Sequence, residues 1–149
     1  MHRFRKTLYL CNEIKIHDGL RNENATLLNT TFSICLADNS TLEVYIDHDL
    51  EFELEHAIQL NDKIYEIGSN EKYYQLTIYG DRTVPSKEAR TYSISKEGSQ
   101  HKLAEAIVVT SLSQKMVFNF MINIERPLVR TKLFTHVDEA KKWLNSLKD

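Results

Sequence analysis

The feature that most constrains the fold is a junction between an apolar strand and a capped helix in the last third of the chain. Residues 103–110 end in a β-branched apolar run, which is typical of a strand buried on both faces. Ser111 follows at once, and Gln114, three residues later, completes the pattern of a capping box. The chain is therefore predicted to turn directly from this strand into a helix that ends near Ile124. A strand joined to a helix in this way is the basic unit of an α/β domain.

The rest of the chain alternates strands and helices in the same manner. We predict a hairpin over residues 32–47 with its turn at 38–40, strands at 73–79, 103–110 and 129–133, and helices at about 51–67, 86–98, 112–124 and 135–147. The order β-β-α-β-α-β-α-β-α predicts a mixed, mostly parallel sheet with an antiparallel N-terminal hairpin and helices packed on the sheet. We expect one α/β domain over 32–149, preceded by an N-terminal extension (1–31) that forms an extra strand or a loop.

Apolar periodicity predicts which face of each helix packs on the sheet. In the first helix, the apolar stripe expected to face inward consists of Leu54, Ala57, Ile58, Ile64 and Tyr65, with Leu60 and Ile67 widening it. In the last helix, Thr135 and Asp138 are the expected capping residues.

The helix at 112–124 carries two apolar stripes. Met116, Phe120 and Ile124 form one, which we expect to face the sheet, and Phe118 and Ile122 form a second stripe on the far side. One sheet can bury only one of these stripes. The second is expected to meet the N-terminal extension, a partner subunit in a homodimer, or an apolar ligand.

Composition indicates a cytoplasmic globular protein. The 149 residues are 42% hydrophobic and 27% charged, and no apolar stretch reaches the ~20 residues that a membrane-spanning helix needs. The N-terminus begins with positive charge, but Asn12 and Glu13 interrupt its apolar run too early for a signal peptide. Cys11 and Cys35 are accordingly expected to be reduced thiols.

The charge is unevenly distributed. Residues 43–71 contain nine acidic residues and one basic residue, although the net charge is only −2. Glu51, Glu53 and Glu55 stand where a helix is predicted to begin. Two interpretations are open: a solvated face that suits the helix dipole, or a docking surface for a basic partner.

The sequence predicts no catalytic, cofactor or metal site. Its four glycines cannot form a phosphate-binding loop, and Asp47, His48 and Asp49 lack the paired spacing of metal ligands. The few basic residues near the N-terminus accompany no nucleic-acid-binding motif. We therefore expect a protein that is not an enzyme, binds no cofactor and contacts no nucleic acid.

Three local motifs resemble the SpoIIAA-like family, bacterial domains related to the anti-anti-sigma (STAS) fold and grouped with the lipid-binding SEC14-like fold. The motifs lie at 85–90, at 107–115 running on to Pro127, and at 131–134 leading to Trp143. The resemblance implies a non-enzymatic regulatory or protein-interaction module. One alternative is a carrier or sensor of a small apolar ligand or lipid, and another is a small enzyme of unrecognised mechanism.

The resemblance also draws attention to Ser86. Anti-anti-sigma factors carry a phosphorylatable serine at the start of the second helix, and Ser86 occupies that position. Pro85 and Glu88 depart from the usual surroundings of that serine. Ser86 is thus a candidate phosphorylation site, and its alternative role is that of a plain helix N-cap.

Overall fold

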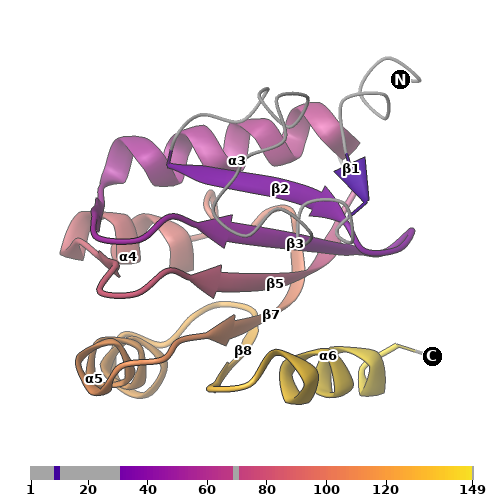
Figure 1. Ribbon diagram of the computed structural model, residues 1–149. Helices are drawn as coiled ribbons and strands as arrows, with labels where there is room; N and C mark the ends of the chain where they lie inside the picture. The colour runs from indigo at the N-terminus through magenta and orange to yellow at the C-terminus, as the bar shows by residue number, and fades with distance from the viewer. Residues whose placement is uncertain (1–8, 11–30, 69–70, 149) are drawn as a thin grey trace.

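The predicted alternation of strands and helices is confirmed by a computed structural model that describes residues 9–10, 31–68 and 71–148 (Figure 1). The elements are β1 (Tyr9–Leu10), β2 (Phe32–Leu36), β3 (Thr41–Ile46), β4 (Glu51–Phe52), α3 (Leu54–Gly68), β5 (Tyr73–Tyr79), β6 (Val84–Pro85), α4 (Lys87–Ile94), β7 (Lys102–Val108), α5 (Leu112–Phe120), the π-helical segment η2 (Met121–Glu125), β8 (Arg130–Phe134) and α6 (Val137–Ser146). The short strands β4 and β6 pair with each other and were not predicted from the sequence.

The main sheet has the strand order β1-β2-β3-β5-β7-β8. Only the β2–β3 pair is antiparallel, as the hairpin pattern predicted, and the other pairs are parallel. From β3 to β8 every crossover moves in the same direction across the sheet, so right-handed connections place α3, α4 and α5 on one face. The helix α6 follows the last strand and packs on the other face. In Figure 1, β2, β3, β5 and β7 lie one above another, and α5 and α6 lie at the same end of this stack.

The β2–β3 turn is fixed by its own polar groups. The carboxylate of Asp38 accepts hydrogen bonds from the backbone N–H and the hydroxyl of Ser40, and it pairs with Lys148 at the end of the chain at 3.0 Å. Partial burial opposes ionisation, but these partners lower the pKa of Asp38 to about 2. The hairpin is thereby tied to the C-terminal end of the domain.

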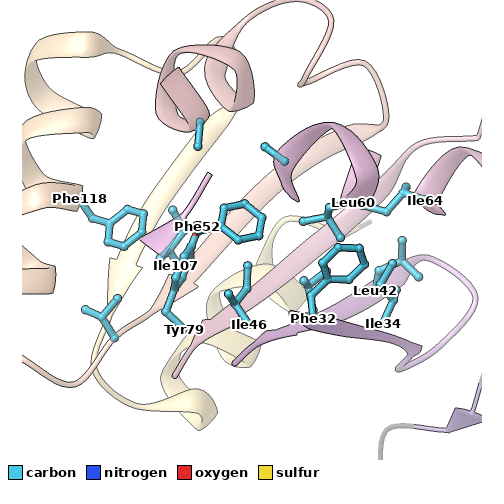
Figure 2. Packing of buried hydrophobic residues seen from close by; sticks show 14 of the residues in the cluster. Phe32, Ile34, Leu42, Ile46, Phe52, Leu60, Ile64, Tyr79, Ile107 and Phe118 are labelled. Carbon is cyan, nitrogen blue, oxygen red and sulfur yellow. The ribbon is translucent and has the colours of Figure 1, made fainter. Parts of the chain in front are cut away.

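The larger hydrophobic core lies between the sheet and the three helices α3, α4 and α5 (Figure 2). The helix α3 supplies Ala57, Leu60 and Ile64, which are all buried. The predicted stripe is thus right for these three residues and wrong for Leu54, Ile58 and Tyr65, which are exposed. The buried face is rotated toward Asn61, whose amide donates to the Tyr92 hydroxyl at 3.0 Å and so packs inside despite its polarity.

A smaller core lies under α6, which buries Ala140 and Leu144 against β5 and β7. Capping of this helix by Thr135 and Asp138 is not observed. His136 is the N-cap residue, and no side chain caps the helix by a hydrogen bond. The packing of the apolar stripe holds α6 in place without a cap.

The expected extension (1–31) falls largely outside the described residues. Of it, the structure describes Thr31 and β1, which pairs in parallel with β2. Cys11 lies outside the described residues. Cys35 is disulfide-bonded, so the prediction of a reduced thiol is wrong at this position.

Among the described helices, none combines the length and the apolar content needed to cross a bilayer.

Candidate interaction surface

The orientation of α5 is set by Gln114, which is fully buried. Its side-chain oxygen accepts from the N–H groups of Thr110 and Ser111, both at 3.1 Å, and its amide donates to the carbonyl groups of Gly80 and Thr83, both at 2.8 Å. The predicted capping box with Ser111 is therefore present. Because these bonds also tie the helix to the β5–β6 loop, the face that carries Gln114 must face inward.

That anchoring reverses the predicted faces of α5. Phe118 lies one turn beyond Gln114 and is buried, with its ring 4.7 Å from that of Tyr79 (Figure 2). Ile122 is partly buried and packs on the same core. The prediction that Phe118 and Ile122 form an outward stripe is therefore wrong. Gln114 lies on this buried face although it is polar, because its four hydrogen bonds satisfy its side chain inside the protein.

Met116, Phe120 and Ile124, which were expected to face the sheet, lie instead on the outer surface. Together with two further exposed leucines they form what we call the apolar row: Leu112 (73% exposed), Met116 (65%), Phe120 (49%), Ile124 (66%) and Leu128 (66%). They are spaced four residues apart, so those in the helical part lie on one stripe. Two apolar stripes were expected on this helix and are present, with their orientations exchanged.

The apolar row continues into a turn that returns the chain to β8. The segment η2 ends with the N–H of Arg126 donating to the carbonyl of Met121 at 2.8 Å, the spacing of a π-turn. The same segment directs Glu125 inward, where it pairs with Arg90 of α4 at 3.0 Å. Arg126 itself has φ = 59°, a left-handed conformation that is unusual for a residue with a side chain.

A shallow groove lies between η2 and the edge strand β8. We call it the arginine groove. Its volume is about 440 Å³, and it is lined by Ile122, Asn123, Arg126, Pro127, Val129, Arg130 and Thr131. The two arginines do not stand out in the sequence, because nothing in their spacing shows that a groove separates the helix end from the strand.

Loops at the carboxyl ends of β3 and β5 support the start of α5. Nδ1 of His48 accepts a hydrogen bond from the backbone N–H of Asp81 at 2.8 Å. The carboxylate of Asp81 accepts a hydrogen bond from the Thr110 hydroxyl at 3.0 Å. Asp49 and Arg82 form a two-pronged ion pair, and both have left-handed backbone conformations. Gly80 is required here, because a Cβ atom would approach the backbone of Asp47 to 2.7 Å.

The described residues contain no cluster of three or more potential metal ligands.

Ser86 is the N-cap of α4, as one of its two interpretations predicted. Its hydroxyl accepts the N–H of Ala89 at 3.1 Å, and its own N–H donates to the carbonyl of Phe52 at 2.9 Å. The residue is 7% exposed. A kinase would therefore reach its hydroxyl only after the loop before α4 opens, and phosphorylation at this position stays a prediction.

The acidic residues Glu51, Glu53 and Glu55 surround the start of α3. Glu51 and Glu55 are exposed, and Glu53 is partly buried, with its N–H donating to Nδ1 of His56 at 2.9 Å. Negative charge near the first turn of a helix suits its dipole. This geometry agrees with a structural role, and a docking role for the three residues stays a prediction.

A polar cluster lies inside the protein, between the sheet and the helices. The carboxylate of Glu105 on β7 accepts from the Thr77 hydroxyl at 2.6 Å and from the Gln75 amide at 3.3 Å, and it pairs with Lys102 at 2.8 Å. Burial, together with the negative charge of Glu105, raises the pKa of the nearby Tyr79 hydroxyl. The adjoining cavity measures about 40 Å³, enough for a few water molecules and far below the ~300–1,000 Å³ of typical ligand pockets.

Comparison with known proteins identifies the class and then the family. The fold is shared by the crystal structure of an uncharacterized protein from the DUF3478 family with a SpoIIAA-like fold, from Shewanella loihica PV-4, at a TM-score of 0.53 and 12% identity over 76% of this chain and 91% of that one. The chain is thus an α/β domain with the SpoIIAA-like fold, as the sequence motifs indicated. It belongs to the family described as "Domain of unknown function (DUF7793)", whose model matches residues 35–148. No curated protein matches the sequence significantly.

Proposed function

We propose that this protein is a non-enzymatic, regulatory protein-interaction module, as in the STAS class, and that it binds a protein partner along the outer face of α5. The main observation that supports this proposal is the exposure of the apolar row to solvent. Full burial of such a side chain contributes roughly 1.5–3 kcal/mol, and these residues, at 49–73% exposed, forgo about half or more of that amount. A continuous exposed apolar stripe of this kind is typical of an interaction surface.

The position of the row adds support. The opposite face of α5 is held rigidly by the hydrogen bonds of Gln114 and the burial of Phe118. A helix fixed in this way presents its outer side chains without first having to become ordered, which lowers the entropic cost of association.

A site-specific photo-crosslinking experiment tests the proposal. A photoreactive residue replaces Met116 in the protein as expressed in the cells that produce it, and the matched control carries the same residue at Lys142, which is exposed on α6. We expect a protein adduct from position 116 that disappears when Phe120→Asp is added. Adducts of equal yield from both positions, or none from position 116, would contradict the proposal. An adduct of twice the 17.4 kDa chain mass would identify the partner as a second copy.

The alternative role, binding of a small apolar ligand, finds less support. The interior cavity of about 40 Å³ is lined in part by Glu105, Lys102 and Gln75, which suit water better than a lipid. An apolar ligand of ordinary size would require α3 and α4 to move apart.

A further inference from the structure

Arginine pairing in this domain singles out the arginine groove. The described residues contain four arginines. Arg82 pairs with Asp49, and Arg90 pairs with Glu125. Arg126 and Arg130 are both exposed, and no ion pair with another described residue is found for either. The two arginines without such a partner thus line the same groove, on either side of Pro127.

Within the described part of the chain, no acidic side chain lines the groove. The nearest acidic residue in the sequence, Glu125, is held on the inner side by Arg90 and is largely buried. The groove therefore offers two guanidinium groups without an intramolecular competitor among its lining residues. Guanidinium groups favour carboxylates, because their N–H groups match both oxygens in a bidentate geometry.

In the chain, the groove residues begin just before the end of the apolar row and continue beyond it. Ile124 and Leu128 flank Arg126 in the sequence, and both are 66% exposed. From Leu112 to Ile124 the row extends roughly 18 Å at the rise of an α-helix. An apolar stripe of this length with positive charge at one end is complementary to an amphipathic helix whose acidic residues lie at one end.

We propose that the arginine groove binds the acidic end of an amphipathic helix in the partner protein, while the apolar row holds the apolar face of that helix. This inference rests on the proposed function and adds the chemistry of the partner. Arg126 and Arg130 bind its carboxylates, and Met116 and Phe120 contact its apolar side chains. The contribution of the arginines decreases as salt concentration rises, because exposed charges are screened.

Selection from a random 16-residue peptide display library on the full chain tests the inference while the partner is still unidentified. We expect the enriched peptides to be apolar and acidic. In fluorescence anisotropy titrations, the double variant Arg126→Glu/Arg130→Glu should weaken their binding by at least about ten-fold, as loss of charge pairs at an interface does. The control Lys87→Glu/Lys142→Glu makes the same change in net charge on α4 and α6 and should leave binding within about two-fold. If the double variant fails to fold, Arg130→Glu alone is used in its place. This single change is expected to weaken peptide binding by a smaller factor.

The outcomes of this experiment separate the two proposals. Peptides that lose binding with Met116→Asp/Phe120→Asp but are indifferent to the arginine reversal overturn this inference and leave the proposed function standing. Peptides indifferent to both changes, or no enrichment at all, contradict both. Binding to phosphatidylglycerol vesicles that depends on the arginines, without enrichment of acidic peptides, would assign the groove to a membrane surface and overturn the inference.

Discussion

At the scale of single residues, two polar side chains act mainly by satisfying backbone groups. Gln114 joins three segments by four hydrogen bonds, and the Ser86 hydroxyl accepts a hydrogen bond from the N–H of Ala89 in the first turn of α4. Each removes buried donors or acceptors that would otherwise destabilise the protein. Their placement also determines which helix faces point outward, and so which residues are available to a partner.

Replacing Ser86 measures its role as a cap. Ser86→Ala should lower the free energy of unfolding by about 1 kcal/mol, because the N–H of Ala89 loses its acceptor. Ser86→Thr keeps the hydroxyl and should cost only a few tenths of that amount. Urea denaturation of the three proteins provides the comparison. Equal stability of the alanine variant and the wild type would show that the cap contributes nothing.

At the scale of elements, the sequence predicted the strands and helices better than their orientations. The β2–β3 hairpin, the capping box at Ser111 and the order of elements follow from local periodicity and turn chemistry, and all are confirmed. The limits of the buried face of α3 and the orientation of α5 do not follow, because the buried polar residues Asn61 and Gln114 interrupt the apolar pattern. Their partners are distant in the sequence, so no local rule identifies them. The arginine groove was missed for a similar reason, since it exists only where η2 meets β8.

The exchanged faces of α5 give a direct prediction. Phe118→Ala should lower the free energy of unfolding by about 3–5 kcal/mol, because a ring buried against Tyr79 leaves a cavity. Phe120→Ala, two residues along the same helix, should lower it by only about 1 kcal/mol, since about half of that side chain is already exposed. Denaturant titration of both variants decides between the orientations. If Phe120→Ala is the more damaging change, the helix faces the other way and the proposed interaction surface is lost with it.

At the scale of the whole molecule, the domain distributes its polar residues unevenly. The face under α3, α4 and α5 contains the Glu105 cluster, whereas the exterior of α5 is apolar. Burying an ion pair is costly compared with an apolar core, and exposing an apolar row forgoes stabilisation. Each feature lowers stability relative to an optimised fold. Such losses are commonly retained where function requires them, and here the apolar row is the feature that the proposed function uses.

The dependence of global stability on pH provides a final prediction, centred on His101. This residue is 5% exposed, its Nδ1 is buried without a hydrogen-bond partner among the described residues, and its ring lies 5.5 Å from that of Tyr65. Burial, and secondarily the positive charge of Lys72, lowers the pKa of His101. The unfolded chain therefore binds a proton at this residue as the pH falls through about 6.5, before the folded protein does. Its contribution to stability is present above that pH and is lost as the pH falls toward the lowered pKa of the folded state.

The variant His101→Phe keeps a ring beside Tyr65 and removes the titrating group. Free energies of unfolding measured by urea denaturation between pH 8 and pH 5 should decline with acidification more steeply in the wild type than in this variant. Any change in packing appears as a constant offset at pH 8, where the histidine is neutral in both states, so it does not affect the comparison of slopes. Parallel pH profiles would show that His101 titrates alike in the folded and unfolded chains, and the burial of its ring would then have no consequence for stability in this range.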